Sequence, residues 1–339
     1  MAIVWCDGFD HQTVDANFTA SGNYVTGGSF GPLLVTTNTR TGTGALQFTQ
    51  SLSFNKTIDV PVQKLGYQLA CRFPASPTGP FGNAFQIRSG STVCAQMHLT
   101  PSLGFLVFNT AGAQVAVTAN NLITLNAYDV IEAQVDRVAD TFELRINGVQ
   151  KVIVTGGGFG GSGLADNINI VKDLGNGANF NCDDFIIWDG TGTINNDFLG
   201  IRRCSTSYPT ADDALMQFVA YNAQASRFPI AAQLPTNDAQ YIEGVNVNDV
   251  SQFQKTGLSS TGTGVAAVRL LARAKASNAA ATQIRLGINS NSVVTNGPVI
   301  PLTTAYAYYS SIIERDPNTA APWTRAAVDL ALARITRAL

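Results

Sequence analysis

Residues 128–154 read YDVIEAQVDRVADTFELRINGVQKVIV, and this stretch decides the fold. Apolar and polar residues alternate from Ile131 to Asp136 and again from Phe142 to Ile146. Side chains of a strand alternate between its two faces, so each run predicts a strand with one apolar face and one solvent-facing face. The residues expected in the core are Ile131, Ala133, Val135, Phe142, Leu144 and Ile146. Asn147-Gly148 predicts a type I′ turn, since both central positions of that turn need φ > 0.

The same stretch resembles the central strands of the concanavalin A-like jelly roll in its laminin-G form. That pattern begins with an aromatic residue and continues with IE-x-x-V, a short turn and F-x-L-x-I-N-G. The present sequence has these parts in the same order. Residues 182–190, CDDFIIWDG, resemble the closing strand of the fold. Short strand-like runs separated by turn residues between positions 66 and 118 are also typical of an all-β sandwich. We therefore expect a mainly-β protein built on a jelly-roll sandwich.

The composition of the chain changes after Asp189, and we place a domain boundary near Tyr208-Pro209. The jelly roll is expected over residues 1–207, and a second, smaller β domain over residues 208–339. Residues 265–276 alternate in a way that favours a strand, although their alanines and arginines also suit a helix. Thr324 is a predicted N-cap, and apolar residues at helical spacing behind it predict a terminal helix over residues 325–339.

The totals exclude several classes of protein. A net charge of −2 with 13% charged residues leaves no electrostatic footprint for nucleic acid. The five cysteines form no CxxC pair, so we expect buried, reduced thiols rather than a zinc site, a redox motif or a disulfide. The opening residues MAIVWCDGFD lack the pattern of a signal peptide, and no run is long enough to cross a membrane. These features predict a soluble protein that is not exported by that route.

A second resemblance spans most of the chain. Three segments resemble structural proteins of tailed bacteriophages: WDGTGTINNDFLG at residues 188–200, DPNTAAPWTRAAV at residues 316–328 and the opening WCDGFD. Members of that group carry a laminin-G-like domain, then a smaller β domain and a short terminal helix. Ile201 stands where the group usually has an aspartate. The resemblance implies a location in the virion rather than a particular reaction.

Two kinds of catalytic site were considered. His11 and His98 are the two histidines of the chain, so a Ser-His-Asp or Cys-His arrangement would need one of them. Glycosidases need two carboxylates that flank the cleaved bond. Glu132 and Asp136 share a face of one predicted strand, but their usual strand motif, E-x-D-x-x-E, is absent and a charged face turned to water is the ordinary case. We therefore assign no catalytic residue.

Two kinds of binding site were also considered. Laminin-G-like domains often hold calcium at the sandwich rim, and the pairs Asp183 with Asp184 or Asp7 with Asp10 are the candidate ligands. The preferred alternative is that these carboxylates accept hydrogen bonds from backbone N–H groups in turns. For a sugar, the candidates are exposed aromatic rings.

Those rings are Phe159, in the glycine-rich surface loop predicted at residues 155–163, and Tyr24. Because neither signal is specific, no metal-binding or cofactor-binding residue is assigned and no cofactor is expected.

These observations predict a non-enzymatic structural protein of a phage virion: a tail-fibre, tail-tip or capsid-decorating subunit assembled in the host cytoplasm. Its partners would be other virion proteins and copies of itself, with a trimer expected by analogy with phage fibres. A neutral composition favours such permanent contacts. The alternative is a carbohydrate-binding adhesin that recognises host surface glycans, and the third hypothesis is a glycan-degrading enzyme.

Overall fold

The computed structural model describes residues 2–9, 24–27, 33–40, 42, 44–49, 52–79, 83–161, 163–172, 177–233, 237–258, 264–279 and 282–339. The chain divides into two compact units, Met1–Cys204 and Ser205–Leu339. The sequence-based boundary after residue 207 lies close to this division. Each unit is described by itself below.

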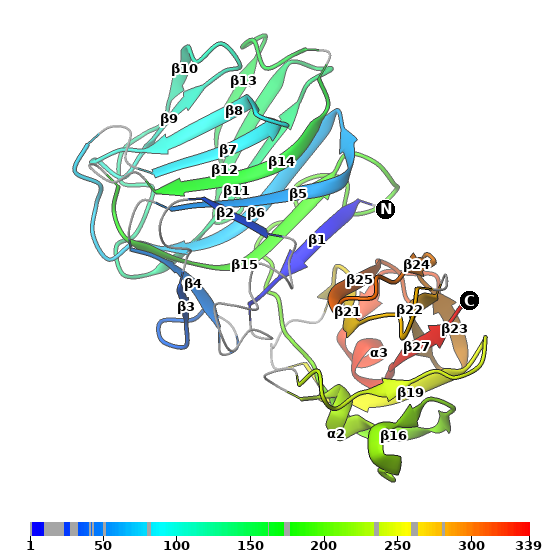
Figure 1. The fold of residues 1–339 in the computed structure, drawn as a ribbon. Coiled ribbons are helices and arrows are strands. Elements are labelled where there is room, and N and C mark those ends of the chain that lie inside the picture. The colour runs from blue at the N-terminus through cyan, green and yellow to red at the C-terminus, as the bar shows by residue number, and fades with distance from the viewer. Residues whose placement is uncertain are drawn as a thin grey trace. The chain divides into compact units, whose positions relative to one another are not determined.

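The first unit is a sandwich of two antiparallel sheets (Figure 1). Of the strands that the structure describes, eight form the first sheet in the order β13-β12-β11-β6-β15-β4-β3, with β1 paired to β15. Their bounds are β1 Ile3–Asp7, β3 Leu33–Val35, β4 Ala45–Phe48, β6 Lys64–Arg72, β11 Tyr128–Asp136, β12 Thr141–Ile146, β13 Val149–Thr155 and β15 Phe180–Asp189.

Seven described strands form the second sheet, in the order β10-β9-β8-β7-β14-β5-β2. Their bounds are β2 Tyr24–Gly27, β5 Leu52–Val62, β7 Asn83–Ser89, β8 Thr92–Leu99, β9 Phe105–Phe108, β10 Gln114–Val117 and β14 Ala165–Lys172. One apolar core lies between the sheets, and it includes the stacked Phe48 and Phe180 rings, whose centroids are 4.4 Å apart. The prediction of a mainly-β, jelly-roll sandwich is confirmed.

The strands predicted from residues 128–154 form as expected. In β11 and β12, Ala133 pairs with Leu144, and all six residues expected in the core are at most 2% exposed. Asn147 and Gly148 adopt φ values of 53° and 75°, as a type I′ turn requires. The Asn147 side chain also accepts a hydrogen bond from the Val130 N–H at 2.8 Å, which ties the turn to β11.

The prediction that the opposite face of β11 is solvent-facing was wrong. Glu132 is fully buried and Gln134 is 8% exposed, because residues 190–204 cross the outer face of the first sheet. We call this segment the strap. The Gly200 N–H donates to Glu132 Oε1 at 3.1 Å, and Trp188, at the end of β15, donates from Nε1 to Gln134 Oε1 at 3.0 Å. Alternation in the sequence identified two faces but not that both are covered.

The second unit is a smaller β domain. Six described strands form its main sheet, in the order β16-β19-β27-β22-β23 with β24 paired to β22, and the pairs β17-β18, β20-β26 and β21-β25 form small sheets. The bounds are β16 Pro209–Met216, β17 Val219–Ala220, β18 Ile242–Glu243, β19 Val250–Lys255, β20 Gly264–Val265, β21 Val268–Ala274, β22 Gln283–Ser290, β23 Val293–Asn296, β24 Ile300–Pro301, β25 Ala307–Ile313, β26 Trp323–Thr324 and β27 Leu332–Arg337. Three short helices complete it: η1 Tyr221–Ala223, α2 Phe228–Ala231 and α3 Arg325–Leu330. The strand predicted within residues 265–276 is present as β21.

The predicted terminal helix is correct only in its first half. Thr324 Oγ1 caps α3 by accepting the Ala327 N–H at 3.2 Å, but α3 ends at Leu330 and β27 follows. β27 lies between β19 and β22 and forms ladder hydrogen bonds with both. A continued helix would leave the facing N–H and C=O groups of both neighbours unpaired, so sheet pairing overrides the helical spacing. None of the described helices has the length and apolar character needed to cross a bilayer.

Candidate functional site

A row of uncharged polar side chains crosses the outer face of the seven-stranded sheet. On β7, β8 and β14 the core takes alternate residues such as Phe85, Met97 and Ile168, so the intervening residues point outward. Four of these outward positions carry amides. The row consists of Asn55 on β5, Asn167 and Asn169 on β14, Gln86 on β7, Gln96 and His98 on β8, and Phe108 on β9.

Hydrogen bonds link the members of this amide row from strand to strand. Asn169 Nδ2 donates to Gln86 Oε1 at 2.9 Å, and Gln86 Nε2 donates to Gln96 Oε1 at 2.6 Å. Gln96 Nε2 then contacts His98 Nε2. The donors therefore run in one direction, from β14 to β8.

The other end of the row is held by Asn167. Its Nδ2 donates to Asn55 Oδ1 on β5 at 2.8 Å. Asn167 and Asn169 are each 6% exposed, and their Oδ1 atoms have no hydrogen-bond partner among the described residues. Gln86, Gln96 and Asn55 are half-buried and remain open to solvent. The buried side chains of Asn167 and Asn169 thus orient the half-exposed amides that a ligand can reach. Their own Oδ1 atoms keep unused hydrogen-bonding capacity.

The row ends in a pocket of about 600 Å³. Its described lining is Val93, Gln96, His98, Phe108, Asn109, Thr110, Ala111 and Gly112. The His98 and Phe108 rings meet edge to face with their centroids 5.4 Å apart. The pocket thus combines polar groups with the Phe108 ring, and none of this lining is acidic.

The pocket rim is held in place by the glycine-rich segment that follows β13. Asn109 Nδ2 donates to the Gly157 carbonyl at 2.8 Å, and Thr110 Oγ1 donates to the Gly158 carbonyl at 2.6 Å. Asn109 Oδ1 also accepts the Ala111 N–H at 3.0 Å. These bonds fix the β9–β10 turn before any ligand arrives, so the pocket is pre-formed.

The aromatic ring predicted to be exposed in that glycine-rich segment is not available to a sugar. Phe159 is fully buried and stacks on Phe142 with the ring centroids 5.5 Å apart. Asp140 holds the segment over the core by accepting the Phe159 N–H at 2.5 Å and the Gly160 N–H at 2.7 Å. These hydrogen bonds lower the pKa of Asp140. The other sugar candidate, Tyr24, begins β2, and its side chain lies outside the described residues.

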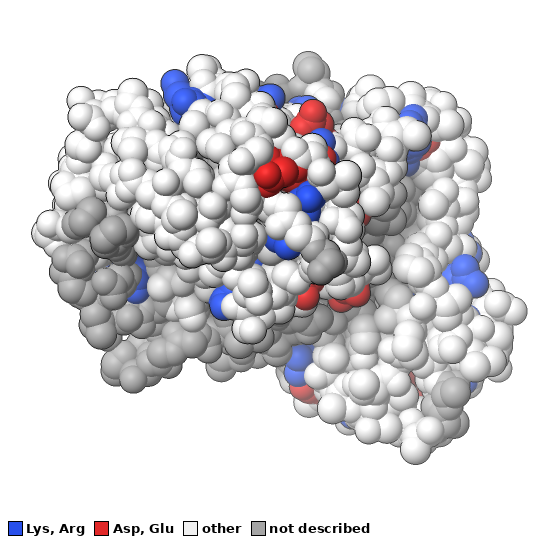
Figure 2. Space-filling view, turned by 90° about the horizontal axis from the view of Figure 1, so that it is seen from above, with Lys and Arg blue, Asp and Glu red and all other residues white. Residues whose placement is uncertain are grey.

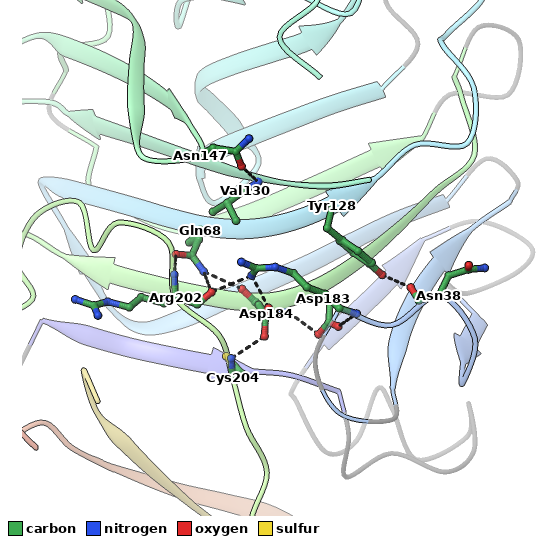
Figure 3. Close-up of polar contacts among 10 residues, drawn as sticks. Asn38, Gln68, Tyr128, Val130, Asn147, Asp183, Asp184, Arg202 and Cys204 are labelled. Carbon is green, nitrogen blue, oxygen red and sulfur yellow. Dashed lines mark hydrogen bonds and ion pairs between the residues drawn. The ribbon is translucent and has the colours of Figure 1, made fainter. Parts of the chain in front are cut away.

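The acidic pair Asp183 and Asp184 lies within β15 rather than before it, beneath the strap (Figure 3). A bulge in β15 gives Asp184 a φ of 51°. Asp183 accepts the Arg40 N–H at 2.8 Å and the Asp184 N–H at 2.7 Å. Asp184 accepts the Cys204 N–H at 2.6 Å and pairs with the Arg40 guanidinium at 2.5 Å.

All four carboxylate oxygens of this pair are therefore engaged by protein donors. Gln68 holds the next part of the strap, donating to the Arg202 carbonyl at 3.0 Å and accepting the Arg202 N–H at 2.9 Å. This cluster closes the strap onto the sheet.

The other acidic candidates also accept hydrogen bonds from backbone N–H groups. Glu132 lies under the strap, and burial raises its pKa against the opposing hydrogen bond from Gly200. Asp136 accepts the Val138 and Ala139 N–H groups in the turn after β11. Asp7 accepts the Phe9 N–H at 2.8 Å. Within the described ranges no group of three or more His, Cys, Asp or Glu side chains could hold a metal.

Asp10 and His11 lie outside the described residues. His98, interpreted from sequence as a structural polar residue, instead lines the pocket at 8% exposure. The amides of the row were not singled out as site residues. The sequence does contain a signal for them, because amides alternate with apolar residues in FQI at residues 85–87, AQM at 95–97 and NIN at 167–169.

Comparisons with known proteins give only distant likenesses. No family model matches the chain, and no curated protein is similar in sequence. Among solved structures, a sialidase is 12% identical with a TM-score of 0.42, covering 55% of this chain and 18% of its own. Domain 4 of AbnA, an extracellular GH43 arabinanase from Geobacillus stearothermophilus solved with arabinotriose, is 15% identical with a TM-score of 0.40 over 57% and 95%. The carbohydrate-binding module CBM66 from Bacillus subtilis is 11% identical with a TM-score of 0.35 over 50% and 97%.

Proposed function

We propose that the first unit binds a glycan on the outer face of its seven-stranded sheet and has no catalytic activity of its own. The observation that carries this proposal is the amide row that runs into a pre-formed pocket. Sugar hydroxyls both donate and accept hydrogen bonds, which matches half-exposed Gln86 and Gln96. The Phe108 ring supplies an apolar surface for the C–H face of a sugar ring.

The absence of an acidic pair at this site supports binding rather than cleavage. Glycoside hydrolysis by the usual route needs two carboxyl groups on either side of the bond. Among the described residues that line the pocket there is neither Asp nor Glu. Glu132, which was the leading candidate acid, is buried on the other sheet.

A glycan panel tests the proposal directly. The purified chain should retain neutral glycans on an array, and Phe108→Ala should weaken that binding. Phe198→Ala is the matched control, since Phe198 packs on Trp188 at the outer face of the opposite sheet. Loss of binding in both variants, or binding that Phe108→Ala leaves intact, would remove this site from the proposal. Release of reducing ends from a bound glycan would show an enzyme instead.

We propose, as a second and compatible function, that the protein is a structural subunit of a tailed-phage particle. The sequence resemblance at residues 188–200 and 316–328 supports it. Sparse charge supports contacts with copies of itself and with other virion proteins: Figure 2 shows few charged side chains on the face it views. Cross-linking of intact particles, followed by peptide mapping, tests this assignment. A particle preparation that lacks the protein would contradict it.

A further inference from the structure

The amide row is long, and its length bears on the kind of glycan that it fits. It reaches from Asn55 on β5 to Phe108 on β9, across the adjacent strands β5, β14, β7, β8 and β9. Neighbouring strands lie about 4.8 Å apart, so four spacings give a row of about 19 Å. One strand spacing is close to the repeat of a sugar ring in an extended chain. A monosaccharide would cover only one end of such a row.

The row is also uncharged along its length. Its hydrogen-bonding groups are amides and one imidazole, and the amides recognise hydroxyl groups without an ionic partner. A cation on this face, Arg88, lies opposite Asn167 in the pairing of β7 with β14. Arg88 Nη2 is bound to the Ser91 carbonyl, which turns this guanidinium toward the β7–β8 turn. The chemistry therefore favours neutral sugars over uronic or sialic acids.

The two ends of the row differ. At one end the pocket, with Phe108 and the fixed turn of Asn109 to Gly112, presents a concave wall. At the other end Asn55 is half-buried and Thr57 beside it is exposed. An elongated ligand would be held by a ring in the pocket and would extend across the strands toward β5.

We propose that this face binds an extended, uncharged glycan chain that lies across the strands, with one ring in the pocket and later rings over the amides. The inference rests on the proposed glycan-binding function and adds the ligand class and its direction. Successive sugar rings would reach the half-exposed amides of Gln96 on β8, Gln86 on β7 and Asn55 on β5, while buried Asn169 on β14 lies between Gln86 and Asn55 and orients Gln86.

Calorimetric titration with neutral oligosaccharides of increasing length tests the inference. Four linear series, of β-1,4-glucan, β-1,3-glucan, α-1,4-glucan and β-1,4-mannan, would each be used from two to six residues. In the series that binds, affinity should rise by about tenfold from the disaccharide to the pentasaccharide, as one or two additional hydrogen bonds would give. It should then level off, because Asn55 on β5 is the last described member of the row.

Two variants test the direction of the chain. Phe108→Ala should weaken the short and long oligosaccharides by the same factor, because every ligand uses the pocket. Asn55→Ala should weaken only the pentasaccharide and hexasaccharide, since shorter chains do not reach β5. Gln47→Ala is the matched amide control: it lies on β4 of the other sheet, where its amide donates to Asn181, and should change nothing. Circular dichroism of each variant checks that it is folded.

The possible failures are distinguishable. If none of the four series binds and the array retains no glycan, the proposed function and this inference fall together. If glycans bind but the disaccharide binds as tightly as the pentasaccharide, only the extended chain is overturned. If Phe108→Ala and Asn55→Ala lower the affinity with the same dependence on oligosaccharide length, the proposed direction of the chain is overturned. Preferential binding of alginate or hyaluronan oligosaccharides would overturn the assignment to uncharged glycans.

Discussion

Leu144→Ala would test the register on which the first unit depends. Leu144 is fully buried in β12, where it pairs with Ala133 on β11 and with Val152 on β13. Truncation removes three side-chain carbons from the core between the sheets. Strands on both sides are fixed by their ladders and cannot move in to fill the space, so a cavity remains.

The expected cost follows from that rigidity. Leu→Ala replacements in cores cost about 2–5 kcal/mol, and a site that cannot collapse lies in the upper part of this range, about 3–5 kcal/mol. For a unit of 150–250 residues this corresponds to a fall in Tm of about 6–20 °C. Ile153→Ala on β13 is the control, because Ile153 is 53% exposed and its truncation should change stability by about 0.5 kcal/mol or less.

Urea unfolding of both variants would measure the difference, followed by hydrogen exchange on peptides from residues 128–155. These peptides report on the first unit separately from residues 205–339. If Leu144→Ala costs less than about 1 kcal/mol, or no more than Ile153→Ala, the assigned register and the core built on it are refuted.

Three further predictions concern the strap, the closing strand and the thiols. Burial raises the pKa of Glu132 above its ordinary 4.5, so between 4.5 and the raised value the folded chain binds more protons than the unfolded chain. The free energy of unfolding therefore falls as the pH rises through this range. Glu132→Gln should flatten this pH dependence of the urea midpoint, and an unchanged slope would place its source elsewhere. Gly66→Ala places a Cβ 2.4 Å from the Trp188 indole and should cost about 1–3 kcal/mol with a shift in tryptophan emission, whereas Gly264→Ala, with nothing within 4 Å, should be neutral. All five cysteines should react with iodoacetamide in denaturant without prior reduction, and protection of the pair Cys71 and Cys182, whose Sγ atoms are 3.7 Å apart, would reveal a disulfide instead.

The local sequence was sufficient wherever a strand, turn or cap is decided by neighbouring residues. Alternation from Ile131 to Asp136 predicted β11. Asn147-Gly148 predicted the turn between β12 and β13, because Asn and Gly tolerate φ > 0 better than other residues do. Thr324 was recognised as an N-cap because its side-chain oxygen can accept a backbone N–H of the first helical turn. Such features need no information from distant parts of the chain.

Tertiary structure decided which polar positions are buried and which polar groups meet. Glu132 is in a pattern typical of a wet strand face, but residues 190–204 cover it, and a periodic pattern carries no information about a later segment. The last residues of the chain have helical spacing, yet β27 pairs on both edges, and sheet hydrogen bonding outweighs a weak local preference. The amide row joins residues 55, 86, 96 and 169, which come together only because antiparallel pairing places their strands side by side. Alternation within each strand determines the face on which each amide lies, whereas the order of strands in the sheet brings the amides together into one site.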